Sequence, residues 1–368
     1  MSSHSILESK MDSEEIPRKE AALKWIMNVL KKDGNFNINL LNIVKLPLEA
    51  SNRIFYRFKI IISNSTETSI KSFILMDINP LSNSIKSIEN FINFAGLFKN
   101  YNLNVPVIYA KNIENGFLIV SDLGELTYYD YIQNNLKNQN SINFNISELY
   151  KSAINSLLKL QVYTKEDVLL KYNLDIQKTI MNWFIEWYLK KHCKLIDNID
   201  KEKIIDIFSK IINNLDEQTK VFVHNDYHSR NLIYDIDNNN NNTESGIVDF
   251  QDAILGPVCY DLASLLHDCY INLDENLISE MIIYYWENAK ICKIKVNSDF
   301  TCFMKDFEYT SLQRCIKNIG VFSRLYYHSG NDKYMQYIPR LLGRCKLICS
   351  KYSELTDLHE MIILCLSK

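Results

Sequence analysis

One polar segment constrains the fold of this chain more than any other. The run HNDYHSRN, residues 224–231, lies between the apolar stretches 221–223 and 232–234, and a third stretch, 246–248, leads directly into Asp249. Short apolar runs bounded by polar residues predict strands. We therefore predict a polar loop between paired strands, the kind of position from which catalytic groups are usually presented.

The spacing within this segment is typical of phosphoryl transfer from ATP to a hydroxyl. Asp226 would orient or deprotonate the attacking hydroxyl, while Asn231 and Asp249 would hold magnesium on the triphosphate, because a hard cation prefers oxygen ligands. The pattern predicts a small-molecule kinase that uses ATP and Mg²⁺. The alternative, from the residues alone, is a chance cluster of polar side chains in a turn-rich loop.

The wider pattern resembles a known family, the aminoglycoside phosphotransferase-like kinases. These carry His-x-Asp-x-x-x-x-Asn, then Asp, then Tyr-Asp-Leu/Ile-Ala, and the last element is YDLA at residues 260–263. Within that family the chain is most similar to bacterial anomeric kinases of N-acetylmuramate and N-acetylglucosamine, which work in cell-wall recycling. The branch similarity lies in HNDYHSRNL (224–232), VDFQDA (248–253), FILMD (73–77), WFIEWYL (183–189) and LQRCIKNIG (312–320), within about residues 47–339.

The resemblance implies an α+β, bilobal, protein-kinase-like fold. A small β-rich nucleotide-binding lobe would cover residues 1–120, with 1–12 disordered, a hinge would cover 121–126, and a mainly helical lobe would cover 127–368. ATP would lie between the lobes, with its adenine edge on hinge backbone at Val120, Ser121, Asp122 and Leu123. The implied activity is transfer of the γ-phosphoryl group to the anomeric hydroxyl of an amino sugar.

A hairpin before the predicted strands takes the place of the phosphate-covering loop of that fold. It includes Ser51, Asn52 and Arg53 and contains no glycine. Its small residues allow main-chain N–H groups to approach a phosphate, and Arg53 adds a positive charge. An ordinary turn explains the same residues equally well.

The lysine that holds the ATP phosphates in typical kinases is replaced here by Met76. Glu89, on the following predicted helix, is then left without its usual partner. Either another cation substitutes, or phosphate binding rests on magnesium and backbone; the candidates are Arg53, Arg57 and Lys71.

Several residues near the loop have two interpretations each. His224 either takes part in catalysis or shapes the loop, and Asp252 either contacts magnesium or substrate or caps the loop. His228 and Arg230 either reach sugar oxygens or phosphate, or form a solvated loop face. By analogy with the family motif, Asp261 bonds the backbone of the catalytic loop.

The predicted helical lobe supplies candidates for a sugar pocket. Such a pocket needs aromatic faces and polar side chains that can make bidentate hydrogen bonds, and we expect Trp187, Gln313 and Arg314 to contribute. Arg314 would pair with the lactyl carboxylate of N-acetylmuramate. Trp183 and Trp187 are four residues apart, so a buried helix stripe is the alternative for the tryptophans.

Composition narrows the class of partner. The chain has 368 residues with 41 basic and 44 acidic side chains, a net charge of −3 that offers no general attraction to nucleic acid or an anionic membrane. Nine scattered cysteines show neither metal-site nor disulfide spacing, and no apolar run suits a signal peptide or membrane span. We expect a cytoplasmic protein with a small-molecule amino-sugar substrate; no oligomeric state is predicted.

The expected elements are mixed at first and then helical. We predict a helix at 14–32, strands at 54–62 and 69–76, a helix at 85–99, strands at 105–110 and 117–121, and mostly helices afterwards. The asparagine tract 238–242 would lengthen a surface hairpin.

Two other functions compete with an amino-sugar kinase. One is a kinase of another alcohol, such as an aminoglycoside or choline, and the other is a catalytically silent nucleotide-binding scaffold. The near-neutral composition disfavours a pocket for a polycation, and the presence of Asp226, Asn231 and Asp249 together disfavours the scaffold.

Overall fold

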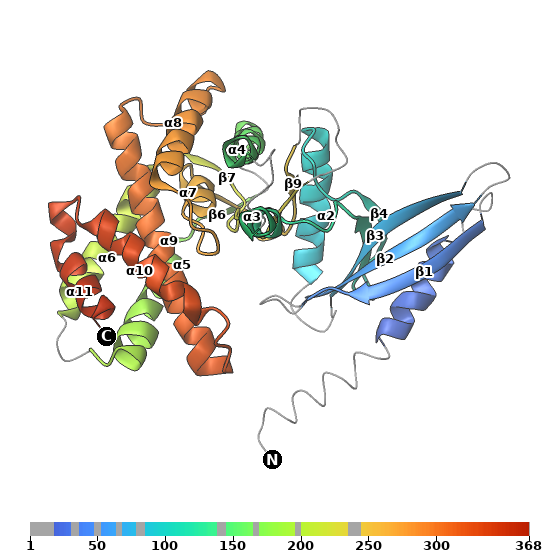
Figure 1. The fold of residues 1–368 in the computed structure, drawn as a ribbon, viewed down its shortest axis with the longest axis horizontal. Helices are drawn as coiled ribbons and strands as arrows, with labels where there is room; N and C mark the ends of the chain where they lie inside the picture. The colour runs from blue at the N-terminus through green and yellow to red at the C-terminus, as the bar shows by residue number, and fades with distance from the viewer. Residues whose placement is uncertain are drawn as a thin grey trace, which may run out of the picture. The chain divides into compact units, whose positions relative to one another are not determined.

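The structure is a computed structural model of the chain. It describes residues 18–30, 37–47, 53–63, 68–78, 85–137, 145–164, 169–195, 200–234 and 244–367. The chain divides into two compact units, which we call unit 1 (Met1–Gly124) and unit 2 (Glu125–Lys368) (Figure 1). The predicted hinge spans this division, and the predicted lobe boundaries remain a prediction.

Unit 1 combines an N-terminal helix over residues 18–30 with a five-stranded sheet. In chain order its elements are β1 (Asn37–Lys45), β2 (Arg53–Ser63), β3 (Thr68–Ile78), α2 (Ile85–Asn100), β4 (Ile108–Asn112) and β5 (Phe117–Ser121). The strands lie in the order β1-β2-β3-β5-β4, and each neighbouring pair is antiparallel (Figure 1).

The N-terminal helix packs against one face of this sheet. Tyr56, Phe58 and Ile60 alternate along β2 and form one buried cluster with Ala22 and Ile26 of the helix. Because side chains alternate between the two faces of a strand, every second residue of β2 points toward the helix. The cluster gives unit 1 its own apolar core.

Unit 2 is mainly helical. Its helices are α3 (Tyr128–Lys137), α4 (Ile146–Val162), α5 (Leu174–Trp183), the π-helix η2 (Phe184–His192), α6 (Lys201–Glu217), α7 (Tyr260–Leu266), α8 (Glu275–Ile291), α9 (Phe300–Ser329), the 3₁₀ turn η4 (Met335–Tyr337), α10 (Ile338–Cys349), the 3₁₀ turn η5 (Ser353–Leu355) and α11 (Thr356–Leu366). Two small sheets accompany them. One has the order β6 (Leu170–Lys171), β10 (Ile254–Pro257), β7 (Lys220–Val223), and the other pairs β8 (Leu232–Ile233) with β9 (Gly246–Ile247).

The long helix α9 is the centre of unit 2. It packs against α5, η2, α6, α7 and α10 (Figure 1). Gly320 lies where α9 crosses the junction of α5 and η2, and a Cβ atom built there would come within 2.5 Å of the backbone nitrogen of Phe184. Only glycine therefore allows this crossing without movement of one helix.

Most predicted elements are present, with three differences. The strands expected at 54–62, 69–76 and 117–121 and the helix at 85–99 are confirmed, and the mixed α+β class with a sheet-bearing first part and a helical second part is confirmed. β1 was not predicted, and the strand expected at 105–110 begins only at Ile108. The prediction that the strands flanking the loop pair with each other was wrong, since β7 pairs with β10 and β8 pairs with β9.

Candidate active site

The loop of the predicted catalytic residues, 224–231, which we call the catalytic loop, runs from β7 to β8, and the β8–β9 pair brings its end next to Asp249. The N–H of Val248 donates to the carbonyl of Asn231 at 3.1 Å, so Asn231 lies opposite the residue that precedes Asp249. Asn225 and Asp249 have φ angles of 79° and 64°, a left-handed conformation that asparagine and aspartate tolerate better than most residues. The backbone turns sharply at both positions.

The orientation of the Asn231 amide suits a metal ligand. Its Nδ2 donates to the carbonyl of Asp226 at 2.9 Å, which leaves the side-chain oxygen on the other side of the amide. Gln251 donates from one Nε2 to a carboxylate oxygen of Asp249 at 2.8 Å and to one of Asp252 at 3.2 Å. The sequence analysis gave no role to Gln251, which is buried and holds these two carboxylates in place.

His224 shapes the loop. It is 1% exposed, its Nε2 lies 2.9 Å from the carbonyl of Val248, and its Nδ1 accepts the N–H of Asp226 at 3.3 Å. Burial lowers the pKa of His224 to about 4, so the ring is neutral near pH 7, with the proton on Nε2 and the lone pair on Nδ1. The contacts support the loop-shaping interpretation of His224 over a role in proton transfer.

Asp226 is held as a carboxylate. Burial raises its pKa, but electrostatic interactions, the largest of them with Lys317, His228 and Arg314, outweigh that effect and bring the pKa below its usual value. Lys317 is partly exposed and donates to the hydroxyl of Tyr260 at 3.1 Å. The sequence analysis assigned no role to Lys317, although it follows Arg314 by one helical turn on α9.

Asp261 binds the start of the catalytic loop. Its two carboxylate oxygens accept the N–H groups of His224 at 2.6 Å and Asn225 at 3.1 Å. Burial raises the pKa of Asp261 to about 7, against these two N–H donors and Arg314, which favour the charged form. Bonding of the loop backbone by Asp261 is as the sequence analysis expected.

A second carboxylate, Asp268, binds the middle of the same loop and was not predicted. One of its oxygens accepts both the N–H of Ser229, at 3.0 Å, and the hydroxyl of that serine, at 2.5 Å. The other accepts the N–H of Tyr270 at 2.8 Å. Asp268 is 5% exposed, and its two bonds to Ser229 are buried.

The two adjacent residues predicted on α9 lie in different surroundings. Arg314 is 7% exposed, donates from Nη1 to the carbonyl of Asn225 at 3.0 Å and lies 4.6 Å from the ring centre of Tyr260. Gln313 is 0% exposed and donates to Gln177 at 2.9 Å. Arg314 thus supports the catalytic loop, and the structure gives Gln313 no surface for a substrate; their substrate roles remain predictions.

Arg230 and His228 turn toward a group of tyrosines. The guanidinium of Arg230 lies 3.7 Å from the ring centre of Tyr270 and donates to the hydroxyl of Tyr337 at 3.0 Å. The ring of His228 meets the ring of Tyr270 edge-on at 5.3 Å. Arg230 is therefore not a solvated loop residue, since it ties the loop to η4.

Trp187 lies in η2, which packs against α9. It is partly buried, with the Nζ of Lys191 4.4 Å from its ring centre and the ring of His328 at 6.5 Å. Trp183 is also partly buried, under Arg324. Neither tryptophan is a fully buried stripe residue, and contact of Trp187 with a substrate remains a prediction.

In unit 1 the predicted phosphate loop is only partly described. Ser51 and Asn52 lie outside the described residues, and Arg53 donates to the hydroxyl of Ser87 at 3.0 Å. Met76 is 3% exposed and lies in β3, where the resemblance places the missing lysine. Phosphate binding by this loop remains a prediction.

The predicted adenine-binding segment has two different halves. Val120 pairs with strands on both sides, and the N–H of Ser121 donates to the carbonyl of Val107 at 2.8 Å. Asp122 binds Arg57 through Nε at 2.7 Å, and although burial raises the pKa of Asp122, its bonds to Arg57 and Ser72 lower it below the usual value. Arg57 is thus already neutralised, which makes it a poor substitute for the phosphate lysine.

Leu123 differs from its neighbours. Among the described residues it has no hydrogen bond to its main-chain groups, so it is the member of the predicted segment best suited to meet an adenine edge. Nucleotide contact at Leu123 remains a prediction.

The described residues can be searched for membrane-spanning helices and for the state of the cysteines. None of their helices is long and apolar enough to cross a membrane. All nine cysteines are free; seven of them are buried, and Cys292 and Cys302 are exposed.

Comparison with known proteins identifies the family. Residues 46–291 match the model of the phosphotransferase enzyme family (APH). A protein of Neisseria meningitidis serogroup B named N-acetylmuramate/N-acetylglucosamine kinase is 32% identical over 71% of this chain and 75% of its own length. A protein of the same name from Pseudomonas putida is 30% identical over 79% of this chain and 81% of its own length.

Solved structures agree on the fold. Aminoglycoside 2'-phosphotransferase-IIIa, in its GDP complex, aligns with a TM-score of 0.57 at 12% identity, over 87% of this chain and 98% of that one. ADP-bound aminoglycoside phosphotransferase APH(2'')-Ib aligns with a TM-score of 0.51 at 15% identity, over 87% and 96%. The chain therefore belongs to the phosphotransferase enzyme family, with a protein-kinase-like fold, and is a phosphotransferase that acts on an alcohol, a sugar kinase.

Proposed function

We propose that this enzyme transfers the γ-phosphoryl group of ATP to the anomeric hydroxyl of N-acetylmuramate and N-acetylglucosamine. The observation that carries the proposal is the arrangement of the catalytic loop. Two buried carboxylates bind its backbone, Asp226 is held ionised, and Asn231 and Asp249 follow each other across one strand pair. A general base, an amide and a second carboxylate are the parts that phosphoryl transfer needs.

The residues present fit magnesium. The side-chain oxygen of Asn231 and the carboxylate of Asp249 are hard ligands, and Mg²⁺ in kinases takes few ligands from protein. Magnesium, when bound there, would neutralise phosphate charge and orient the nucleotide. Gln251 keeps the Asp249 carboxylate in one orientation, and the bond from the Nδ2 of Asn231 to the main-chain carbonyl of Asp226 prevents the Asn231 amide from turning over.

Asp226 is the group that meets the acceptor. Its carboxylate would accept a hydrogen bond from the sugar hydroxyl and take the proton as the bond from the sugar oxygen to the γ-phosphorus forms and the bond from the γ-phosphorus to the bridging oxygen breaks, with ADP as the leaving group. His224 accepts the N–H of Asp226 and so holds the backbone that carries this carboxylate, and because the His224 ring is neutral it adds no competing charge. Lys317 supplies a positive charge on the acceptor side, where the negative charge of the transferred group accumulates.

The choice of acceptor rests on the relatives. Two proteins that this chain matches at 30% and 32% identity carry the name N-acetylmuramate/N-acetylglucosamine kinase. The aminoglycoside enzymes align at 12% and 15% identity, which supports the fold only. A place in cell-wall recycling follows from the same resemblance and remains a prediction.

The test is a substrate panel read by ADP release with Mg²⁺-ATP. The panel contains N-acetylmuramate, N-acetylglucosamine, kanamycin and choline, with methyl N-acetylglucosaminide as the matched acceptor whose anomeric oxygen is blocked. We expect turnover of the two free acetylated sugars only. Turnover of the methyl glycoside at the rate of N-acetylglucosamine would show that another hydroxyl is the acceptor.

A variant separates catalysis from nucleotide binding. In Asp226→Asn the amide keeps the volume of the side chain but cannot accept the proton, so turnover should fall by at least 10²-fold. Nucleotide affinity, measured by isothermal titration calorimetry, should stay within about threefold. A variant that retains more than a tenth of native turnover would contradict the role of Asp226.

A further inference from the structure

Arg230 lies in the catalytic loop between a residue that is firmly held and a candidate metal ligand. The residue before it, Ser229, donates to Asp268 from its N–H and its hydroxyl, and its carbonyl accepts the N–H of Tyr129 at 3.0 Å. The residue after it, Asn231, has the side-chain oxygen that suits magnesium. The conformation at Arg230 therefore decides how the supported part of the loop presents that oxygen.

Three tyrosines from separate parts of unit 2 surround the guanidinium of Arg230, and we call them the tyrosine cage. The central carbon of the guanidinium lies 3.7 Å from the ring centre of Tyr270, 4.9 Å from that of Tyr129 and 5.9 Å from that of Tyr337. Tyr270 meets the ring of Tyr337 edge-on at 5.1 Å and the ring of Tyr129 at 6.4 Å. A guanidinium within about 6 Å of an aromatic face is attracted to it, and here the rings also support one another.

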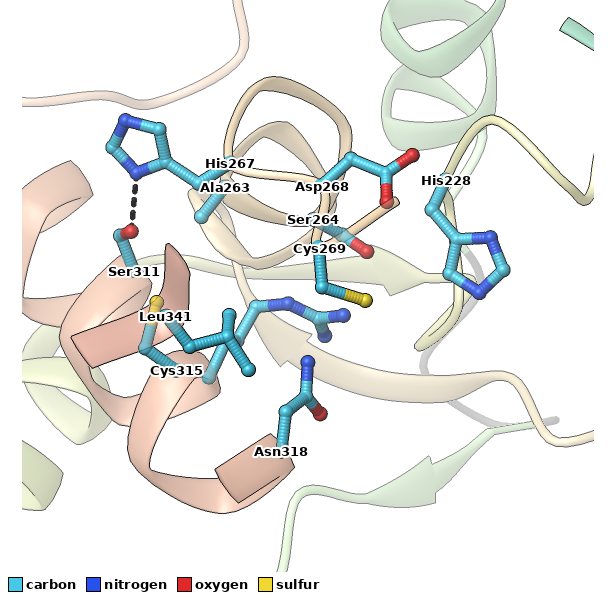
Figure 2. Close-up of a pocket in the computed structure, with 11 residues that line it drawn as sticks. His228, Ala263, Ser264, His267, Asp268, Cys269, Ser311, Cys315, Asn318 and Leu341 are labelled. Carbon is cyan, nitrogen blue, oxygen red and sulfur yellow. Dashed lines mark hydrogen bonds between the residues drawn. The ribbon is translucent and has the colours of Figure 1, made fainter. Parts of the chain in front are cut away.

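The cage shares its supports with the backbone of the loop. Tyr129 donates its N–H to the carbonyl of Ser229, and the N–H of Tyr270 donates to one oxygen of Asp268, whose other oxygen binds Ser229. Figure 2 shows the carboxylate of Asp268, on the turn that follows α7, directed toward the part of the loop that carries His228. The start of α3 and the turn after α7 thus each hold the loop backbone and the arginine side chain together.

We propose that Arg230 is a positioning residue for the metal site: the tyrosine cage holds it, and it fixes the turn of the loop that presents the side-chain oxygen of Asn231 to a divalent cation. The inference rests on the proposed function, in which Asn231 is a magnesium ligand. Groups that orient a metal ligand without touching the metal change metal affinity or activity by roughly 10- to 100-fold when they are replaced.

The alternative is that the charge of Arg230 binds phosphate directly. The geometry favours positioning, because the guanidinium lies over Tyr270 and its Nη2 donates to the hydroxyl of Tyr337 at 3.0 Å. Stacking of this kind, combined with a directed hydrogen bond, needs the planar group of arginine, and a lysine supplies the charge without the plane. The two roles therefore predict different results for a lysine at this position.

The first test is the affinity for Mn²⁺ in the presence of saturating ADP, measured by electron paramagnetic resonance on the full chain. Mn²⁺ takes oxygen ligands as Mg²⁺ does, and this titration needs no turnover. In Arg230→Met the dissociation constant for Mn²⁺ should rise at least about tenfold. Arg324→Met is the matched control, because Arg324 is also partly exposed and lies over the ring of Trp183 at 4.6 Å; its effect should stay within about twofold.

Tyr337→Phe tests the same contact by a smaller change. It keeps the ring and removes the hydroxyl that accepts from Arg230, so the dissociation constant should rise roughly 2- to 10-fold, as expected for one hydrogen bond. Added to Arg230→Met, the same substitution should change nothing further, because the two residues act through one contact. Independent, multiplicative effects of the two substitutions would contradict the cage.

Arg230→Lys separates position from charge. We expect Mn²⁺ affinity to stay at least about fivefold below native, with kcat for N-acetylglucosamine lowered as well. Recovery of native affinity in Arg230→Lys, or native affinity in both Arg230→Met and Tyr337→Phe, would overturn the proposal. If the native protein binds Mn²⁺ with ADP but turns over no acetylated sugar, the proposed acceptor is wrong, and the Mn²⁺ affinities of the variants still decide the role of Arg230.

Discussion

Gly320→Ala should damage both the stability and the activity of the enzyme. A Cβ atom at this position would lie 2.5 Å from the backbone nitrogen of Phe184 and 2.9 Å from the carbonyl carbon of Trp183. An ordinary contact is about 3.4 Å or longer, so α9 must move from the α5–η2 junction by roughly 1 Å. Overpacking of this kind costs about 1–3 kcal/mol, and the atoms involved are backbone atoms that cannot rotate away.

A second glycine provides the control. Gly343 is also in a helix, and a Cβ atom there would meet nothing within 4 Å. Gly343→Ala should therefore stabilise the protein by about 0.5–1 kcal/mol, through lower backbone entropy in the unfolded chain. Urea unfolding at pH 7.5 gives both values. Equal stability changes in the two variants would refute the argument that the helices cross at Gly320 because nothing larger fits.

The effect of Gly320→Ala on activity follows from the same movement. Arg314 and Lys317 are on α9 and face Asn225 and Tyr260, so a 1 Å displacement alters the support of the catalytic loop. We expect kcat to fall at least tenfold while the affinity for ATP changes less, because misplacement of this size affects the reaction more than binding. An unchanged kcat in a destabilised variant would show that α9 does not position the loop.

Three further predictions concern the loop and its supports. Burial lowers the pKa of His224 to about 4, so this side chain binds fewer protons in the native than in the unfolded state between pH 6.5 and 4, and its contribution to the free energy of unfolding should fall by up to about 3 kcal/mol as the pH falls through that window. Burial also raises the pKa of Asp261 to about 7, which acts in the opposite direction, so the quantity to measure by urea unfolding is the difference in unfolding free energy between the native protein and His224→Gln. That difference should decrease from pH 7 to pH 5, and an unchanged difference would contradict the effect of burial on His224. Asp268→Asn should lower the free energy of unfolding by about 1.5–3 kcal/mol and lower kcat, because an amide cannot accept hydrogen bonds from all three donors of Ser229 and Tyr270. A variant as stable as the native protein would show that Asp268 does not hold the loop. Lys317→Met should reduce kcat/KM at least tenfold with little change in melting temperature, and a steady-state assay that finds less than a twofold change would remove Lys317 from the site.

The local part of the site was predictable from the sequence. Two short segments carry the predicted catalytic and metal-binding residues, and their order and spacing already indicate how these side chains meet: His224, Asp226, Asn231 and Asp249. The loop, β8 and β9 follow from short apolar runs that lie beside polar ones. The π-helix and the crossing at Gly320 were not predictable, because they depend on two helices that meet in space.

Other differences between the predicted and the observed structure also have specific causes. β1 escaped prediction because an irregularity between Leu40 and Asn42 breaks the alternation of its side chains. The pairing of β7 with β10 was missed because the two strands are far apart in sequence, and the prediction paired only strands that are neighbours along the chain. Asp268 and Lys317 carry no local signature, since their roles come from loop atoms far away in sequence.

The central claim is that Asp226 activates the anomeric hydroxyl of an acetamido sugar. The most direct measurement is the ³¹P and ¹³C NMR spectrum of the product formed from ¹³C-labelled N-acetylglucosamine and Mg²⁺-ATP. We expect phosphorus coupling to the anomeric carbon, a product without a reducing end, and no such product from Asp226→Asn. Coupling to carbon 6, or the same product from the variant, would contradict it.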